Sequence, residues 1–413
     1  MITRIEITGY RCFRELGIDL GPYQVLAGAN GAGKTTLLDA PVLLGDLLRH
    51  RQAADAFLQI QDDRRAPRAG TLTELLHQGE GDGFGFGFEA RLPTEVTAAL
   101  AERTLASSTS RVPTHLRYEL RLEVTAYRLD VVKERLSLFV EDEEGNRSEP
   151  QEVLIREGKG ATKFIPESTE DATEIPPLRV PSVQLALGAV PADPVLFPAA
   201  LWFAQFLSDG VVYFAPDWEQ LTRPARPGDP MRVLPSGRNL PWLALDLSRR
   251  DPDRFASWVD HVRTALPQIT AIRMREREED RYAYFIVEYA GGFTVTSSGL
   301  SAGTLCILAY TLLPYLDDAA LPELLIVEEP ENGIHPRAIE TVVQSLSSLY
   351  DSQVWISTHS PIVLAHTELR DVLAARLNGD GQVTVVRGTE PPRLRDWRGS
   401  IDIGTLFAAG VLS

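Results

Sequence analysis

The 413-residue sequence has few cysteines and no long apolar run, and each shortage excludes a class of protein. Cys12 and Cys306 are the only cysteines, too few for a disulfide framework or a structural zinc site. The longest apolar run, Ile307 to Leu316, contains Pro314 and is too short to cross a bilayer. The N-terminus has no apolar signal core, so we expect a cytoplasmic protein without a membrane segment.

Positive charge is also scarce. Lysines and arginines number 41 against 57 aspartates and glutamates, a formal net charge of −16 that argues against a generally basic nucleic-acid binder. A hydrophobic content of 44% with 24% charged residues is typical of a soluble globular protein. The length exceeds what one core usually supports, so we expect a large two-lobed domain or two to three units.

Local patterns indicate a mixed α/β chain. Residues 23–28 predict a short buried strand, followed by a glycine-rich turn and a helix that Pro41 should kink or break. Residues 116–124 alternate between apolar and charged, which favours an antiparallel strand with one wet face. Residues 251–267 predict an amphipathic helix, and residues 282–298 predict a hairpin that turns at Gly291-Gly292.

A change of composition divides the chain. Residues 166–240 are rich in proline and contain an apolar block and arginines, which indicates an insertion of short helices and loops. We therefore predict an N-terminal lobe at 1–165, this insertion at 166–240 and a C-terminal lobe at 241–413. No 20–50-residue repeat is visible, and no heptad run is long enough for a coiled coil.

Residues 28–35, GANGAGKT, fit the pattern GxxxxGK[ST] between a predicted strand and a predicted helix. The glycines let backbone N–H groups converge on an anion, and the helix N-terminus adds positive charge. We expect Lys34 to reach the β- and γ-phosphates of a nucleotide and Thr35 to place its hydroxyl on Mg²⁺. The alternative, a chance glycine turn, is the weaker interpretation in this context.

In LLIVEEPENGIHP, residues 324–336, a buried strand ends on two carboxylates and a proline. A nucleotide site needs an acid at a neighbouring strand end to hold Mg²⁺ through water, and hydrolysis needs a second acid to orient the attacking water. Glu328 and Glu329 fit these roles in that order. A solvated strand end would explain one acid, but not two followed by a proline and a glycine-bearing turn.

Two further stretches extend the pattern. In residues 300–304, Ser301 is placed to cap a helix that starts at Ala302, and the same helix N-terminus would make an anion site. Residues 354–361, VWISTHSP, predict a strand whose end presents His359. A lone histidine there is usually structural, but after the acidic strand in a parallel α/β order it becomes a candidate for a hydrogen bond to the γ-phosphate.

Together these four stretches resemble the Walker A, signature, Walker B and switch-histidine motifs of an ABC-type ATPase head. They are most similar to the SMC/RecF/OLD group of AAA family ATPases, over residues 1–48 and about 237–413. The resemblance implies an α/β fold, an ABC-type P-loop NTPase head with a mostly parallel core sheet flanked by helices. It also implies an antiparallel β subdomain and a helical or loop insertion in place of a coiled coil.

The resemblance also implies the site. Two subunits would sandwich ATP and Mg²⁺ in a homodimer, with Ser301 and Gly303 contacting the γ-phosphate on the partner's P-loop; a higher oligomer is compatible with this. Catalytic roles fall to Lys34, Glu329 and His359, and metal binding to Thr35 and Glu328. The implied nucleotide contacts are Gly28, Asn30, Gly31, Gly33, Lys34, Thr35, Thr36, Ser301 and Gly303.

Two positions depart from the family pattern. Glu328 stands where many ABC ATPases have aspartate, which moves the carboxylate one methylene further out. The glutamine that helps to bind Mg²⁺ in related heads has three candidates, Gln59, Gln61 and Gln78, and stays open.

Three functions compete. The first is a DNA-linked ATPase of a prokaryotic antiphage defence or repair system that controls an effector protein. The second is a nucleotide-gated scaffold with little turnover, against which Glu329 counts. The third, a transporter ATPase subunit, is disfavoured because Lys34 and Ser301 lie much further apart than in transporters. The residues after His359 are too few for the Toprim domain of OLD-type nucleases, so we expect any nuclease activity on another chain.

Clustered arginines are candidates for DNA contacts, because they can neutralise phosphates on an otherwise acidic protein. The alternative is solvated faces and local ion pairs. Arg273, Arg275 and Arg277 are interleaved with Glu276, Glu278 and Glu279, so we predict that these arginines form ion pairs with these glutamates. The candidate clusters are Arg64, Arg65 and Arg68; Arg223, Arg226, Arg232 and Arg238; and Arg249, Arg250 and Arg254.

Overall fold

The computed structural model describes residues 1–60, 66–104, 111–125, 127–142, 144–158, 160–167, 175–378 and 381–390. The chain divides into two compact units. The antiparallel unit comprises Met1–Gly21, Asp39–Val211 and Arg376–Val385; the motif unit comprises Pro22–Leu38, Val212–Ala375 and the described residues from Val386. The predicted lobes at 1–165, 166–240 and 241–413 are not tested by this division and stay a prediction.

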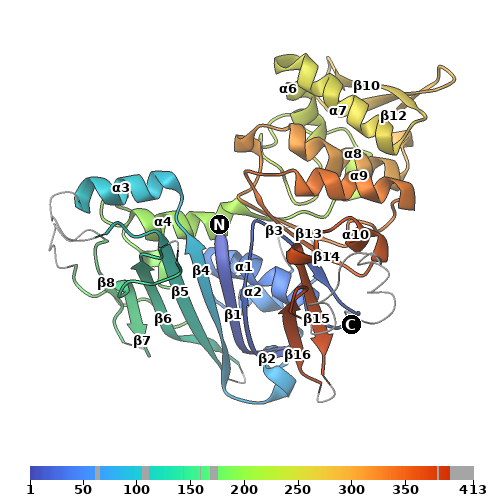
Figure 1. The fold of residues 1–413 in the computed structure, drawn as a ribbon. Coiled ribbons are helices and arrows are strands. Elements are labelled where there is room, and N and C mark those ends of the chain that lie inside the picture. The colour runs from blue at the N-terminus through green and yellow to red at the C-terminus, as the bar shows by residue number, and fades with distance from the viewer. Residues whose placement is uncertain are drawn as a thin grey trace. The chain divides into compact units, whose positions relative to one another are not determined.

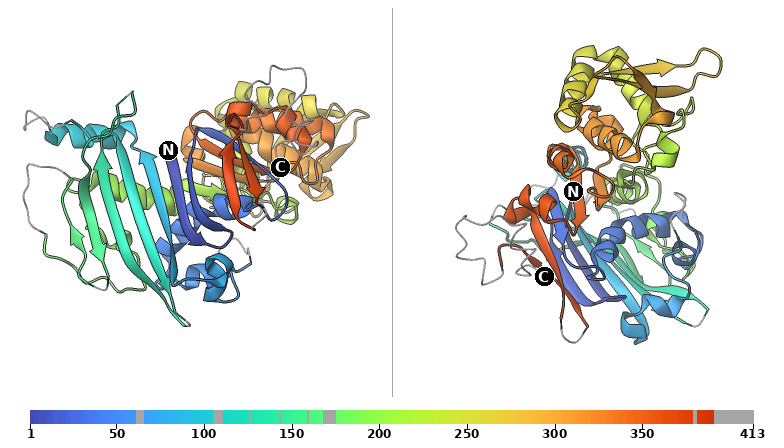
Figure 2. Two further views of the ribbon diagram at one scale, coloured as in Figure 1. Left: turned by 60° about the horizontal axis from the view of Figure 1, so that its bottom comes forward. Right: turned by 90° about the vertical axis from the view of Figure 1, so that its right-hand side faces the viewer.

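The antiparallel unit is built on a seven-stranded sheet in the order β2-β1-β4-β5-β6-β7-β8, whose strands lie side by side in Figure 2. Along β5, Leu116, Tyr118, Leu120 and Leu122 are buried while the intervening charged residues occupy the other face, so the predicted alternation is confirmed. The strands are β1 (Ile2–Tyr10), β2 (Phe13–Asp19), β4 (Gly83–Arg91), β5 (His115–Val124), β6 (Leu129–Phe139), β7 (Gln151–Glu157) and β8 (Lys163–Phe164).

Helix α4 (Pro198–Gln205) packs on this sheet through Phe203, whose ring lies 5.6 Å from that of Tyr118. The chain before α4 is tied to the sheet by Glu134, which is fully buried and accepts the N–H of Ala186 at 2.6 Å. The unit's other helices and turns are α2 (Asp55–Leu58), η1 (Leu72–Leu75), η2 (His77–Gly79), α3 (Thr94–Thr104), η3 (Leu187–Ala189) and η4 (Phe206–Gly210).

Three of the four motifs include or directly follow strands of a six-stranded sheet in the order β16-β15-β3-β14-β13-β9. Strands β15, β3, β14 and β13 are parallel, so their carboxyl ends meet at one edge. The three strands predicted in the motifs are confirmed, whereas β9, three residues long in the proline-rich stretch, was not predicted. The strands are β3 (Tyr23–Ala27), β9 (Val211–Tyr213), β13 (Leu324–Glu328), β14 (Gln353–Thr358), β15 (Val372–Leu377) and β16 (Val383–Arg387).

Helix α1 (Lys34–Arg49) follows β3 and continues through Pro41. Of the two predicted effects of this proline, the break is therefore wrong, and the kink stays a prediction. Proline removes only one backbone donor, and the helix is held by buried leucines on both sides of it, among them Leu38 and Leu43.

A second group of elements in the motif unit is a three-stranded antiparallel sheet, β10-β11-β12, beside α6 and α7 (Figure 1). The helix predicted at 251–267 is α7, and the predicted hairpin is β11 and β12. The elements are α5 (Trp218–Leu221), α6 (Leu240–Arg250), α7 (Pro252–Ala265), β10 (Ile269–Glu276), β11 (Ala283–Tyr289), β12 (Thr294–Thr296), η5 (Ser297–Gly299), α8 (Ala302–Leu312), η6 (Leu313–Tyr315), η7 (Asp318–Ala320), α9 (Pro336–Ser347), α10 (Pro361–Ala365) and η8 (Leu369–Asp371).

Among the described residues, no helix is both long and apolar enough to span a bilayer. Within the same residues the longest helix is α1, with 16 residues, so none forms a long coiled coil.

Candidate active site

Lys34, the first residue of α1, is buried against the loop that connects β3 to α1. Lys34 is only 6% exposed, and its Nζ donates to the backbone oxygens of Gly28 at 2.8 Å and Ala29 at 3.1 Å. In the part of the chain that the structure describes, it forms no ion pair. Burial lowers the pKa of Lys34, although nearby carboxylates raise it. A buried ammonium that donates only to carbonyl oxygens lacks a directly bonded counter-ion to offset its desolvation.

The glycines of this loop are required for two different reasons, backbone conformation and close packing. Gly31 and Gly33 have φ of 80° and 79°, a left-handed conformation that favours glycine. A Cβ on Gly28 would lie 2.5 Å from the carbonyl oxygen of Ala375 on β15, whereas a Cβ on Gly31 would meet nothing within 4 Å. Gly28 is therefore required by packing, while Asn30 and Gly31 form the exposed rim of the loop.

The two predicted metal ligands contact each other. The Thr35 hydroxyl donates to Oε1 of Glu328, which is the last residue of β13. The other carboxylate oxygen, Oε2, accepts the hydroxyl of Tyr213 at the end of the neighbouring strand β9. Tyr213 carried no signal in the sequence, because its strand is short and lies far from the motif it contacts.

These groups fit a magnesium ion. A threonine hydroxyl that donates its proton to a carboxylate keeps its lone pairs free, and Mg²⁺ is commonly bound by one or two carboxylates together with substrate phosphates. Within the described ranges, no three His, Cys, Asp or Glu side chains are grouped to hold a metal by themselves. Thr35 and Glu328 would therefore bind the cation together with the phosphates.

Glu329, the candidate base, has both carboxylate oxygens hydrogen-bonded. Oε1 lies 2.9 Å from Nδ1 of His359, and Oε2 accepts Nδ2 of Asn332 at 2.7 Å. Burial would raise the pKa of Glu329, but these bonds and the charges of His359 and Lys34 outweigh it and hold the pKa below its ordinary 4.5. Its φ of 46° is uncommon for a residue with a side chain and marks strain at this position.

A second network fixes the strand end beside His359. Glu331 accepts the Thr358 hydroxyl at 2.6 Å, and the same hydroxyl oxygen accepts the N–H of Ser360 at 2.9 Å. The turn after β13 is thus tied to the chain on both sides of His359. Asn332, Glu331 and Thr358 were not predicted as site residues, although all three lie within the quoted motifs.

The signature stretch packs against the same turn. Ser301 accepts the N–H of Thr304 at 3.2 Å and caps α8, which begins at Ala302 as predicted. A Cβ on Gly303 would lie only 2.6 Å from the carbonyl oxygen of Gly333, so the first turn of α8 touches the turn after β13. Ser301 itself is exposed. The contact of Ser301 and Gly303 with a partner's nucleotide stays a prediction.

The structure therefore brings Lys34, Thr35, Glu328, Glu329 and His359 to one edge of the sheet, at the ends of β3, β13 and β14. The magnesium glutamine stays open. Gln59 and Gln78 belong to the antiparallel unit, and Gln61 lies outside the described residues.

Comparison with known families agrees with this geometry. The family described as "AAA domain, putative AbiEii toxin, Type IV TA system" matches residues 25–365. The chain belongs to this family. A second family, described as "AAA domain", matches residues 4–43 of this AAA protein. The chain is thus an ABC-type ATPase domain. Its predicted resemblance to the SMC/RecF/OLD group is confirmed by the relatives.

Two curated relatives match short segments of the AAA protein. The DNA replication and repair protein RecF of Acidothermus cellulolyticus is 41% identical over 66 residues, 16% of this chain and 18% of the relative. The OLD nuclease of Thermus scotoductus is 42% identical over 48 residues, 11% of this chain and 9% of the relative. The matches thus span less than a fifth of either relative.

A solved structure matches nearly the whole chain. It is the crystal structure of the SmcHead bound to the C-winged helix domain of ScpA, with a TM-score of 0.53 at 13% identity. The match covers 93% of this chain and 96% of that chain. At this identity the likeness shows the fold alone, and the predicted α/β head with a mostly parallel sheet and antiparallel sheets is confirmed.

Most of the candidate DNA-binding arginines are engaged locally. The Arg68 side chain is 5% exposed and forms ion pairs with Asp39 at 2.6 Å and Asp46 at 2.8 Å, which favours the ion-pair alternative for this residue. Its neighbours Arg64 and Arg65 lie outside the described residues. The sequence could not reveal the pairing, because both aspartates lie on α1.

The other two clusters differ from each other. Arg249, Arg250 and Arg254 all have local partners, which favours the ion-pair alternative. In the second cluster Arg238 pairs with Asp229 at 2.9 Å. Arg223 and Arg226 are exposed and form no ion pair with the described residues.

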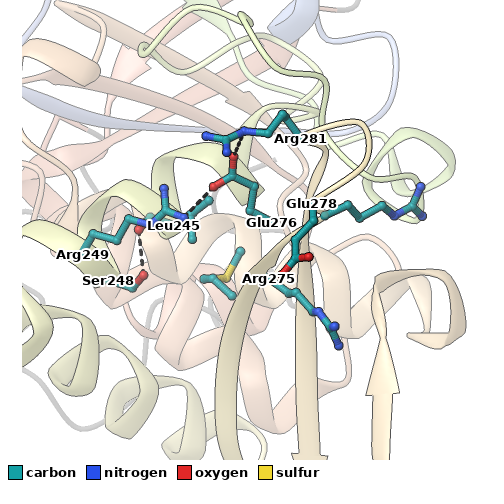
Figure 3. Close-up of a pocket in the computed structure, with 9 residues that line it drawn as sticks. Leu245, Ser248, Arg249, Arg275, Glu276, Glu278 and Arg281 are labelled. Atoms are coloured by element: carbon teal, nitrogen blue, oxygen red, sulfur yellow. Dashed lines mark hydrogen bonds and ion pairs between the residues drawn. The ribbon is translucent and has the colours of Figure 1, made fainter.

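Arg273 on β10 and Arg277, which follows β10, form ion pairs, but not with the predicted glutamates. Arg273 pairs with Glu288 on β11 at 3.0 Å, and Arg277 pairs with Asp280 at 3.3 Å. Figure 3 shows Glu276 between Arg249 and Arg281, at 2.6 and 2.5 Å, in a surface pocket. Adjacent residues of a strand point to opposite faces, so Arg273 pairs across the sheet, whereas Arg277 lies beyond the strand and pairs within the turn that follows it.

Proposed function

We propose that this AAA protein binds ATP with Mg²⁺ and hydrolyses it. The observation that carries the proposal is Lys34, a buried ammonium held only by carbonyl oxygens. A nucleotide phosphate would supply the missing counter-ion through charge-assisted hydrogen bonds. The same sheet edge carries a hydroxyl–carboxylate pair suited to Mg²⁺ and a second, ionised carboxylate.

Each residue then has a distinct task. The loop from Gly28 to Thr36, with Asn30, Gly31 and Gly33, presents its backbone to the phosphates, and Lys34 binds their oxygens. Thr35 and Glu328 hold Mg²⁺, which neutralises charge on the phosphates when bound.

The hydrolytic step falls to Glu329. Asn332 and His359 hold its carboxylate, which orients the attacking water and accepts its proton. A carboxylate whose pKa lies below its usual value is ionised at neutral pH and ready for this role. His359 also lies at the strand end that faces the γ-phosphate in our proposal.

We further propose a homodimer that binds ATP between two copies, each with Ser301 and Gly303 facing the partner's nucleotide. Support comes from the exposed Ser301 and from the contact of Gly303 with the turn that carries Glu329. Through this contact, a nucleotide bound by one copy would influence the position of Glu329 in the other copy.

As a biological role we propose a DNA-linked regulatory ATPase of a defence or repair system, acting on an effector protein of a separate chain. The family description names a toxin of a type IV toxin–antitoxin system, and the relatives are named for replication, repair and a nuclease. Arg223 and Arg226 are the described arginines of the predicted clusters that remain best placed for phosphate contacts.

Steady-state ATP hydrolysis, with and without linear double-stranded DNA at low salt, tests the proposal. Glu329→Gln should lower kcat by about 10²–10⁴-fold, the usual contribution of a general base. Glu340→Gln, which changes an exposed glutamate on α9, is the matched control and should hydrolyse normally. Hydrolysis that Glu329→Gln leaves unchanged would contradict the assigned mechanism, and hydrolysis indifferent to DNA would contradict the DNA link.

The dimer is tested by light scattering of Glu329→Gln, which should bind ATP without consuming it. ATP with Mg²⁺ should double the mass, and Ser301→Arg in the same background should prevent this. Ser347→Arg, a change at another exposed serine, should not. A mass independent of ATP would contradict the proposed sandwich.

A further inference from the structure

Tyr213 is the residue at the metal site that no motif accounts for. It ends β9, the edge strand beside β13, and is 7% exposed. Its hydroxyl donates to Oε2 of Glu328, while the Thr35 hydroxyl donates to Oε1. The two hydroxyls thus hydrogen-bond to both oxygens of the carboxylate from two elements, α1 and β9, which are distant in sequence.

These two hydrogen bonds restrict a flexible side chain, because Glu328 is one methylene longer than aspartate. A glutamate has one more rotatable bond, so its carboxylate samples more positions unless both oxygens are held. The bond from Tyr213 fixes Oε2 and thereby keeps Oε1 on the Thr35 hydroxyl. In this arrangement Thr35 gives its proton to the carboxylate and keeps its lone pairs for a cation.

We propose that Tyr213 is a positioning residue that fixes Glu328 beside Thr35 and so sets the Mg²⁺ dependence of nucleotide binding. The inference rests on the proposed function, because it concerns the same ATP site. It predicts an effect on the cation and not on the phosphate loop, since Tyr213 contacts Glu328 whereas Lys34 bonds to the loop carbonyls.

The test is the affinity of a fluorescent ATP analogue across a series of buffered Mg²⁺ concentrations, and in EDTA. Tyr213→Phe keeps the ring and removes the hydroxyl. The Mg²⁺ concentration for half-maximal affinity should rise on the order of tenfold, which corresponds to one charge-assisted hydrogen bond. The affinity in EDTA should stay as in the wild type. Tyr315→Phe is the matched control, because it removes a hydroxyl bonded to His261 elsewhere in the motif unit.

A double-mutant cycle with Glu328→Asp separates positioning from packing. The shorter aspartate should not reach the Tyr213 hydroxyl, so Tyr213→Phe should change the Mg²⁺ dependence much less in that background. An unchanged Mg²⁺ dependence of Tyr213→Phe, an equal loss of affinity in EDTA, or an equal effect in both backgrounds would overturn the inference. If the wild-type protein itself bound no nucleotide, the proposed function would fail as well.

Discussion

Two regions of this protein concentrate charge in opposite ways. On the antiparallel sheet, Arg117 forms ion pairs with three carboxylates, Glu6 at 2.5 Å, Glu89 at 2.7 Å and Glu119 at 3.0 Å. At the carboxyl edge of the parallel sheet, Lys34 is more deeply buried and bonds only to carbonyl oxygens. The first arrangement is complete in itself, whereas the second needs a ligand to complete it.

The difference follows from where the side chains stand. In an antiparallel sheet each residue has cross-strand neighbours, and Arg117 lies opposite Glu89 on β4. At the edge of the parallel sheet the strands have ended, so the side chains of Glu329 and His359 find partners only in turns and helix starts. Such an edge leaves room for a ligand, which is why sites form there in open α/β sheets.

The most direct test of the comparison removes one lysine from each region, Lys34 at the parallel sheet and Lys133 on the antiparallel sheet. Lys34→Met should weaken ATP binding by about 10–100-fold, the loss of a hydrogen bond to a charged group, without destabilising the free protein. Lys133→Met removes an ion pair to Glu119 on the antiparallel sheet and should leave ATP affinity unchanged. Calorimetric titration and thermal unfolding of both variants measure this. Equal ATP affinity in the two variants would contradict the contrast.

The converse experiment removes the central arginine of the antiparallel sheet. Arg117→Met leaves Glu6 and Glu119 with fewer partners and should lower the free energy of unfolding by about 1–3 kcal/mol, with ATP affinity unchanged. Arg121→Met, whose partner Asp82 is mostly exposed, should cost less than about 0.5 kcal/mol. Urea denaturation gives both values, and equal values would argue against a cooperative network around Arg117.

The pH dependence of hydrolysis examines the partners of Glu329. Asn332→Ala removes a bond that lowers the pKa of this carboxylate, so the pKa rises. Because the base must be deprotonated, the acid limb of kcat should move to higher pH. Asn332→Asp should move it further, since a second negative charge raises the pKa again. An acid limb at the same pH in all three proteins would exclude Asn332 as a partner of the base.

The smallest effect concerns a buried acid in the antiparallel unit. Burial raises the pKa of Glu167 to about 7, although the N–H groups of Ala199 and Ala200 at the start of α4 lower it. Since the folded pKa exceeds the unfolded 4.5, stability from this group is present at acid pH and is lost as pH rises through 7. Glu167→Gln should flatten the decline of unfolding free energy between pH 4.5 and 7. An unchanged decline would show that a group other than Glu167 causes this pH dependence.

Much of the site was predictable because its parts are local. The P-loop, the paired glutamates, the histidine strand and the capping role of Ser301 each occupy a short stretch whose residue types report their own geometry. The parallel order of strands then brings the stretches to one edge.

What the sequence could not predict are partners from distant elements. Tyr213 reaches Glu328 from a three-residue strand, and Arg68 finds its aspartates on a helix. Glu276 seemed a suitable partner for Arg275, but adjacent residues of β10 point to opposite faces, and Glu276 pairs with Arg249 and Arg281. The predicted helix break at Pro41 failed for a related reason, because tertiary packing overrides a local helix breaker.

The proposed function depends most on phosphate binding by Lys34, and one measurement tests this most directly. Calorimetric titration of ATP with Mg²⁺ into Glu329→Gln, which should not consume the ligand, counts binding sites per chain. One saturable site per chain, weakened in the Lys34→Met, Glu329→Gln double variant, is the predicted result. No binding, or binding that Lys34→Met leaves unchanged, would contradict it.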